Sequence, residues 1–136
     1  MKTILPFIVL LYFGWVTAQD TNQKTSPVIV AKVALGEAIT IDGITIHFKE
    51  VLEDSRCPSG VTCIWAGRAK VTVGVKEDGQ AIQEKEIIFG QTIEGEISNN
   101  TIFENGNSKL KAFSLEPYPE YEKITDVTNY KLLIYK

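Results

Sequence analysis

Residues 53–67 read EDSRCPSGVTCIWAG and hold both cysteines of the chain, one of its two tryptophans and a Pro-Ser-Gly turn between the cysteines. In an exported protein, two cysteines so close along the chain usually pair with each other. Pro58 fixes its own backbone φ angle, and Ser59-Gly60 allows the reversal that a small ring requires. We therefore predict a Cys57–Cys63 disulfide that closes a loop between two strands.

On both sides of this loop, short apolar runs are separated by turn residues. Apolar and polar residues alternate over 44–48 before the loop and over 69–76 after it, which is typical of half-buried strands. Asp42-Gly43 and Asp78-Gly79 are hairpin signals. Further strands are expected over 28–33, 37–41, 81–89, 109–115 and 130–135, and scattered apolar residues surround a turn at 98–100. This pattern predicts an antiparallel β-sandwich of seven to nine short strands, immunoglobulin-like or a related Greek key, with little or no helix.

The segment from Asp126 to Leu132 has the D-x-x-x-Y-x-apolar spacing of a tyrosine corner. In that motif the hydroxyl of Tyr130 would tie its own loop back onto the start of a strand. The alternative is an ordinary tyrosine that opens an edge strand.

The first eighteen residues have the pattern of a secretory signal peptide. Lys2 precedes an apolar core over 4–16, and Val16-Thr17-Ala18 places small residues before a cut at Gln19. The apolar run is shorter than the ~20 residues that span a bilayer, which argues against a transmembrane anchor. No cysteine lies near the cut, so no lipid anchor is expected. We predict a signal peptide (1–18), a flexible segment (19–26) and one β domain (27–136), exported to the periplasm or beyond.

Cleavage after Ala18 would remove Lys2 and leave 13 basic against 17 acidic residues, a net charge of −4. Lys and Arg form no cluster in the sequence. Nucleic acid is therefore disfavoured as a partner, because binding it requires neutralisation of phosphates. The same charge balance argues against docking on anionic lipid, and no stable membrane insertion is expected after cleavage.

The sequence offers little for catalysis or metal binding. The one histidine, His47, falls on the polar face of its strand, and there is no G-x-S-x-G turn. The acidic pairs Glu84/Glu86 and Glu94/Glu96 have i, i+2 spacing, which places both members on the outer face of a strand as solvated charges. The spacing of the cysteines is not that of a C-x-x-C redox pair. We predict no catalytic residue, no metal and no cofactor.

The cysteine loop itself has two interpretations. As a recognition loop, a rigid turn carrying Asp54, Arg56, Pro58 and Trp65 would bind a partner with little ordering cost. As a purely structural loop, Arg56 would pair with Asp54 or its neighbour at the surface, and the Trp65 indole would pack over the disulfide.

Three segments resemble an uncharacterised family of small bacterial secreted proteins and lipoproteins. They are residues 54–67, which match D-S-R-C-P-x-x-V-x-C-[IV]-W-A-G, the Pro-Tyr-Pro at 117–119, and the Tyr-led strand from Tyr130. The resemblance spans residues 44–135 and implies an origin in the bacterial envelope. It carries no activity or catalytic residue, and the lipidated members of the family differ from this chain at the N-terminus.

Together these features predict a non-enzymatic exported domain that binds a protein or a surface glycan near Arg56–Trp65. A structural envelope domain without a dedicated ligand is the first alternative. A small metal-binding protein or enzyme around His47 is the second.

Overall fold

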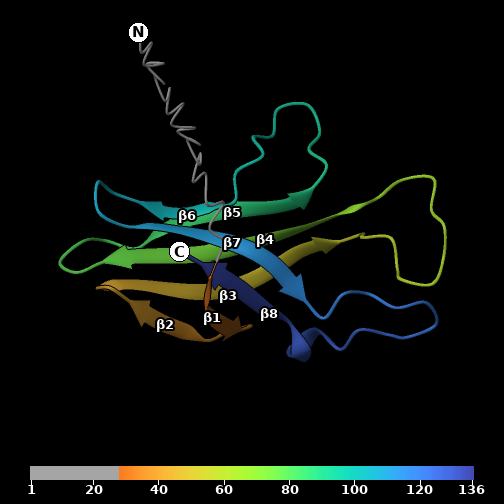
Figure 1. Ribbon diagram of the computed structural model, residues 1–136, viewed down its shortest axis with the longest axis horizontal. Helices are drawn as coiled ribbons and strands as arrows, with labels where there is room; N and C mark the ends of the chain where they lie inside the picture. Colours follow the sequence, from red (N-terminus) through yellow and green to blue (C-terminus); the bar gives the residue numbers. More distant parts are fainter. Residues whose placement is uncertain (1–27) are drawn as a thin grey trace, which may run out of the picture.

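The computed structural model describes residues 28–136, so the predicted signal peptide and the segment 19–26 lie outside the described residues. Two antiparallel sheets of four strands face each other (Figure 1). The strands are β1 (Ile29–Ala34), β2 (Ala38–Ile41), β3 (Ile44–Asp54), β4 (Arg68–Glu77), β5 (Gln83–Gly90), β6 (Thr101–Glu104), β7 (Lys109–Glu116) and β8 (Lys131–Tyr135). Within 28–136 the only helical element is one 3-10 turn, η1 (Val127–Asn129). The prediction of an all-β sandwich with seven to nine strands is confirmed.

The two sheets are built from different parts of the chain. One has the order β2-β3-β4-β5, a run of consecutive hairpins, and the other has the order β1-β8-β7-β6. In the second sheet β1 lies beside β8, so the first and last strands of the chain are paired. β1 thus lies beside three strands that are consecutive in sequence, β6, β7 and β8, although it is far from them along the chain. Greek-key folds contain connections of this kind. None of the helices in the described part of the chain is long and apolar enough to cross a bilayer.

The predicted turn at Asp42-Gly43 connects β2 to β3. Both residues have positive φ angles, 50° and 80°, which suits the tight turn of a two-residue hairpin. The pairing of Ile41 with Ile44 follows directly from this turn. The register of β3 is therefore fixed at its first residue.

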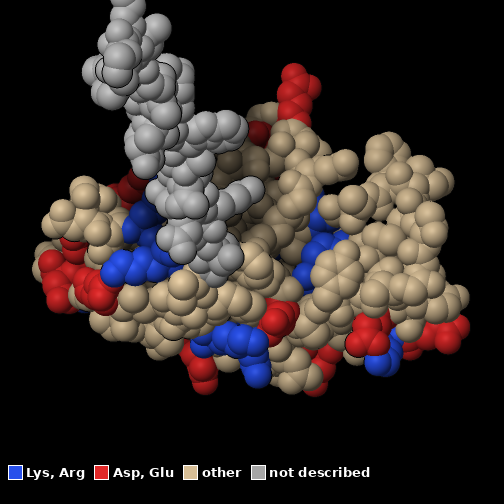
Figure 2. Space-filling model, viewed as in Figure 1, with Lys and Arg blue, Asp and Glu red and all other residues tan. Residues whose placement is uncertain are grey.

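Charged side chains pair across neighbouring strands on the outer faces. Lys70 lies 2.8 Å from Glu86, and Lys49 pairs with Glu84. Both glutamates are exposed, as the i, i+2 spacing predicted. Figure 2 shows acidic and basic side chains side by side along the lower margin of the molecule. Such exposed pairs contribute little to stability, so the fold depends on what lies between the sheets.

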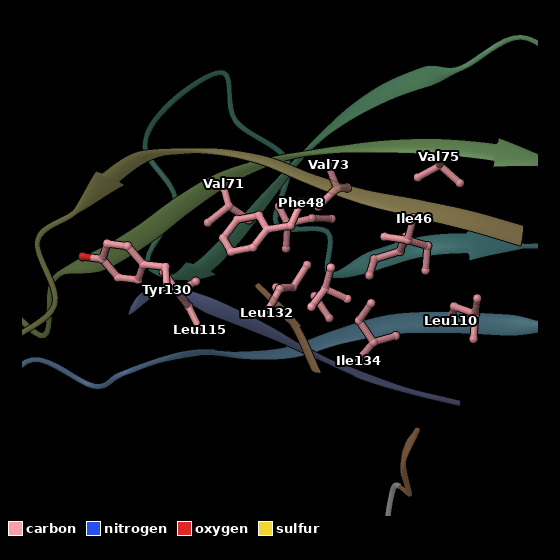
Figure 3. Packing of buried hydrophobic residues seen from close by; sticks show 14 of the residues in the cluster. Ile46, Phe48, Val71, Val73, Val75, Leu110, Leu115, Tyr130, Leu132 and Ile134 are labelled. Atoms are coloured by element: carbon pink, nitrogen blue, oxygen red, sulfur yellow. The ribbon is translucent and has the colours of Figure 1, made fainter. Parts of the chain in front are cut away.

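The core lies between the two sheets and consists of inward side chains, and the half-buried Ile39 and Ile41 of β2 pack against it (Figure 3). Ile44, Ile46 and Phe48 are at most 2% exposed, which confirms the predicted alternation in β3. They face side chains of β7 and β8 such as Leu110 and Ile134. Burial of this apolar surface is the main favourable term in folding.

A bulge in β7 changes the direction of its side chains. Leu110 and Ala112 point into the core, but the register shifts between Ala112 and Ser114, and the next core residue is Leu115. Phe113 is 49% exposed, with its ring 6.0 Å from the ring of Tyr135 in an edge-to-face contact. The bulge therefore directs Leu115 into the core, where regular alternation would have placed Ser114, and Phe113 stays outside.

The hairpin of β3 and β4 continues into the cysteine loop. The N–H of Ser55 donates to the carbonyl of Arg68 (2.8 Å), and the N–H of Cys57 donates to the carbonyl of Ala66 (2.9 Å). Gly67 has a φ of 69°, and a Cβ atom there would lie 1.8 Å from the carbonyl oxygen of Ser55. Only glycine fits so close an approach of the two chain segments.

Candidate functional site

The structure contains the predicted disulfide between Cys57 and Cys63. Gly60 has a φ of 93° and makes the chain reversal inside the ring. Trp65 is 73% exposed and β4 begins only at Arg68, so the indole does not pack over the disulfide as expected. The alternation of the strand does not extend into the loop, and for this reason it does not direct the Trp65 side chain.

A second loop, residues 117–129 between β7 and β8, lies beside the cysteine loop at the same end of the sandwich (Figure 1). The N–H of Ser59 donates to the carbonyl of Pro119 (2.9 Å), and the N–H of Tyr121 donates to the carbonyl of Ser59 (3.1 Å). Ser59 and Glu120 thus form a short parallel bridge between the two loops. We call residues 55–67 and 117–129 together the paired loops.

The paired loops expose an unusual number of apolar side chains. Ile64 is 94% exposed. The other large apolar or aromatic side chains that the paired loops expose are Val61, Trp65, Tyr118, Tyr121, Ile124 and Val127. Figure 2 shows the projecting end of the cysteine loop without charged groups, which lie at its base on the inner side and along the margin below it. Single exposed apolar residues are ordinary, but seven of them on two loops that are bonded to each other make this end of the sandwich the candidate interaction surface.

Arg56 holds the base of the paired loops together. Its Nε and Nη2 atoms donate to the two carboxylate oxygens of Asp54, each at 2.7 Å. Nη1 donates to the carbonyl of Leu115 (2.6 Å), and Nη2 also donates to that of Pro117 (2.9 Å). The side chains of Asp54 and Arg56 are both 9% exposed. The predicted pairing of Arg56 with Asp54 is therefore confirmed, but the pair is buried and not at the surface as expected, so Arg56 does not present its charge to solvent.

Tyr130 completes this cluster from the opposite sheet. Its ring packs at one end of the core and its hydroxyl points away from the other core side chains (Figure 3), donating to Asp54 Oδ2 at 2.8 Å. The tyrosine-corner prediction is wrong, because the hydroxyl binds the carboxylate of Asp54 at the end of β3 and does not tie a loop back onto the start of a strand. The alternative is wrong too, since β8 lies between β1 and β7 and is not an edge strand. Asp126 instead caps η1 by accepting the N–H of Thr128.

The charges in this cluster shift both titrating groups. Burial alone would raise the pKa of Asp54, but the hydrogen bonds from Arg56 and Tyr130 outweigh it and hold that pKa below its ordinary value. Burial, and next the hydrogen bond to Asp54, raise the pKa of Tyr130 to about 12. The cluster is therefore an ionised carboxylate, a guanidinium and a neutral phenol at ordinary pH.

A second ion-pair network fixes the loop that follows β5. Arg68 lies 2.7 Å from Glu53 and 2.5 Å from Glu96, and Lys70 lies 3.5 Å from Glu96. The prediction that Glu94 and Glu96 lie on a strand is wrong, because both lie in this loop. Glu94 is exposed as predicted, but only 15% of the Glu96 side chain is exposed.

A groove of about 310 Å³ opens between the two sheets next to the paired loops. Its walls include aromatic side chains from β5, β7 and the second loop: Phe89, Phe113 and Tyr118. Arg56 and Ala66 of the cysteine loop also border it. The groove is therefore continuous with the paired loops.

Among residues 28–136, no group of three or more His, Cys, Asp and Glu side chains is placed to hold a metal ion. His47 is half-buried, with Nε2 3.2 Å from the carbonyl oxygen of Gly36. This contact lies on β3, away from the paired loops.

Sequence reasoning placed the cysteine loop correctly but missed its partner loop. Ile124 and Val127 follow the Pro-Tyr-Pro at 117–119, in a segment where apolar and polar residues do not alternate as in a strand. Apolar residues in such a segment are a signal from which this exposed surface could have been predicted. Comparison of the chain with models of protein families, with curated proteins and with solved structures finds no match.

Proposed function

We propose that this protein is an exported, non-enzymatic β-sandwich that binds a protein partner through the paired loops. The observation that carries the proposal is the group of exposed apolar side chains on a tightly bonded support. Ile64 and Trp65 directly follow the ring that the Cys57–Cys63 disulfide closes, and Ile124 stands on the loop bonded to that ring. The sandwich supplies the scaffold, and the loops at one end supply the contact.

The support for these side chains reduces what binding costs. The disulfide, the Ser59–Glu120 bridge and the hydrogen bonds of Arg56 each restrict the loops before a partner arrives. A loop that is already ordered loses little entropy on binding, so more of the contact free energy appears as affinity.

The composition of the surface favours a protein over a glycan. Ile64, Ile124 and Val127 are aliphatic, and burying them against another apolar surface gives roughly 25 cal/mol per Å². A sugar offers few apolar groups to such side chains. The exposed Trp65 and Tyr121 are the observation in favour of the glycan alternative, because aromatic faces can stack on sugar rings.

Export is part of the proposal and rests on the N-terminal pattern and the disulfide. An intact mass of protein purified from the envelope or the medium tests it. A mass equal to residues 19–136 less two hydrogens is expected. A mass that retains the first eighteen residues would contradict cleavage.

Capture of partners from an envelope extract tests the binding surface. The Ile64→Ser, Ile124→Ser double variant should lose at least ten-fold of the captured protein. Ile82→Ser is the matched control, because Ile82 is 63% exposed in the β4–β5 connection at the other end of the sandwich. Equal capture by the wild type, the double variant and the control would show that the paired loops are not the binding surface. Capture that survives protease treatment of the extract would favour the glycan instead.

A further inference from the structure

The groove exists because β6 stops short of the end of β7. β6 pairs with β7 only over Lys109–Lys111. Asn100 then ends the pairing, since its carbonyl accepts the N–H of Ala112 (2.8 Å) and its side-chain amide donates to the carbonyl of Ala112 (3.3 Å). Beyond this point no further strand of the described residues lies on that side of β7.

The opposite wall comes from β5, the edge strand of the other sheet. Phe89 and Gly90, its last two residues, border the groove across from Phe113 and Leu115. A Cβ atom at Gly90 would lie 2.7 Å from the carbonyl oxygen of Gly67, so this part of the wall is bare backbone. Between these ends of β5 and β7 the groove is lined mainly by apolar residues.

The charge in the groove is already neutralised. Arg56 borders it, but the guanidinium is paired with Asp54 and also donates to the carbonyls of Leu115 and Pro117. A ligand with its own carboxylate would have to displace these bonds. An uncharged apolar group therefore fits the groove better than an anion.

The volume limits the size of the occupant. An apolar cavity of about 150 Å³ holds one benzene molecule, and pockets for drug-sized molecules begin at about 300 Å³. At about 310 Å³ the groove has room for one large aromatic side chain. Aromatic rings also pack favourably edge-to-face against Phe113 and Tyr118.

We infer that this groove receives an aromatic side chain of the protein partner as the anchor of the interface. The inference rests on the proposed function, because the groove is continuous with the paired loops through Arg56, Ala66 and Tyr118. Interfaces are commonly dominated by one or two large side chains seated in a pocket, surrounded by weaker contacts that exclude water. The groove supplies that pocket, and Ile64 and Ile124 belong to the surrounding contacts.

NMR titration with N-acetyl-tryptophanamide tests the groove directly. Saturable shifts are expected at the amides of Phe89, Gly90 and Phe113. Ser114→Phe fills the groove and should weaken binding at least ten-fold, while Thr40→Phe, on the opposite edge strand β2, should leave it unchanged. The absence of saturable shifts, or an equal titration of the Ser114→Phe protein, would overturn the inference.

Selection of displayed random peptides tests the origin of the side chain. Peptides enriched on the wild-type protein but not on the Ser114→Phe variant should contain Trp, Phe or Tyr. Enrichment without aromatic residues, or binding of the free amide without any selected peptide, would overturn the assignment to a protein partner. The titration does not involve Ile64 or Ile124, so a failure of the paired loops as a binding surface can be told apart from a failure of the groove.

Discussion

Replacement of Asp54 by asparagine tests the cluster that supports the paired loops. The substitution preserves size but removes the charge that accepts two bonds from the Arg56 side chain and one from Tyr130. Removal of one member of a buried ion pair costs about 3–5 kcal/mol, because the other charge is left without a partner. Arg56 would keep its bonds to the carbonyls of Leu115 and Pro117, so we expect a loss near the lower end, about 3 kcal/mol.

The assay is urea unfolding followed by circular dichroism. The midpoint should fall while the slope m remains constant, since the substitution changes stability without changing the surface exposed on unfolding. Glu104→Gln is the control, because Glu104 forms an exposed pair with Lys109 at 2.8 Å. That substitution should cost less than about 1 kcal/mol.

The dependence on pH separates the charge of Asp54 from its shape. Its pKa is lowered in the folded protein, so its stabilisation is present above the unfolded value of ~3.9 and is lost as the pH falls through the folded pKa. The difference between the wild type and Asp54→Asn should therefore shrink below about pH 4. A loss no larger than that of Glu104→Gln, or a difference that persists down to about pH 2, would refute the account of the cluster.

Three further predictions concern other parts of the same end of the molecule. Gly67→Ala should lower the melting temperature far more than Gly36→Ala, which has no atom within 4 Å of the added methyl group and bears only the ~1–2 kcal/mol of a positive φ; equal melting temperatures would contradict the close approach. Since the pKa of Tyr130 is raised to about 12, its stabilisation is complete below the unfolded value of ~10 and is lost as the pH rises through about 12, so alkaline unfolding should be less steep for Tyr130→Phe. Replacing Cys57 and Cys63 by serine should cost about 2 kcal/mol, and a reducing agent should destabilise the wild type but not this variant.

The strands could be predicted because period and turn chemistry are local. The alternation over 44–48 and the Asp42-Gly43 turn both act within a few residues, and the structure has the corresponding elements. The bulge beside Phe113 was missed, although the apolar positions change phase from Leu110 and Ala112 to Phe113 and Leu115. Its position depends on how β7 matches β8.

The role of Arg56 could not be predicted for a different reason. A local rule finds Asp54 two residues away, and that pair does form. The carbonyl of Leu115 and the hydroxyl of Tyr130 come from far along the chain, and no periodicity reports which distant segment will cover a loop. The pairing of Ser59 with Glu120 was missed for the same reason.

The bridge between Ser59 and Glu120 has a consequence for the order of events in a newly made chain. The two halves of the paired loops belong to distant parts of the sequence, and residues 117–129 take their place between β7 and β8. The complete surface therefore appears only after the last strand has joined its sheet. A truncated or still unfolded chain lacks it, so engagement of a partner would report that folding has been completed.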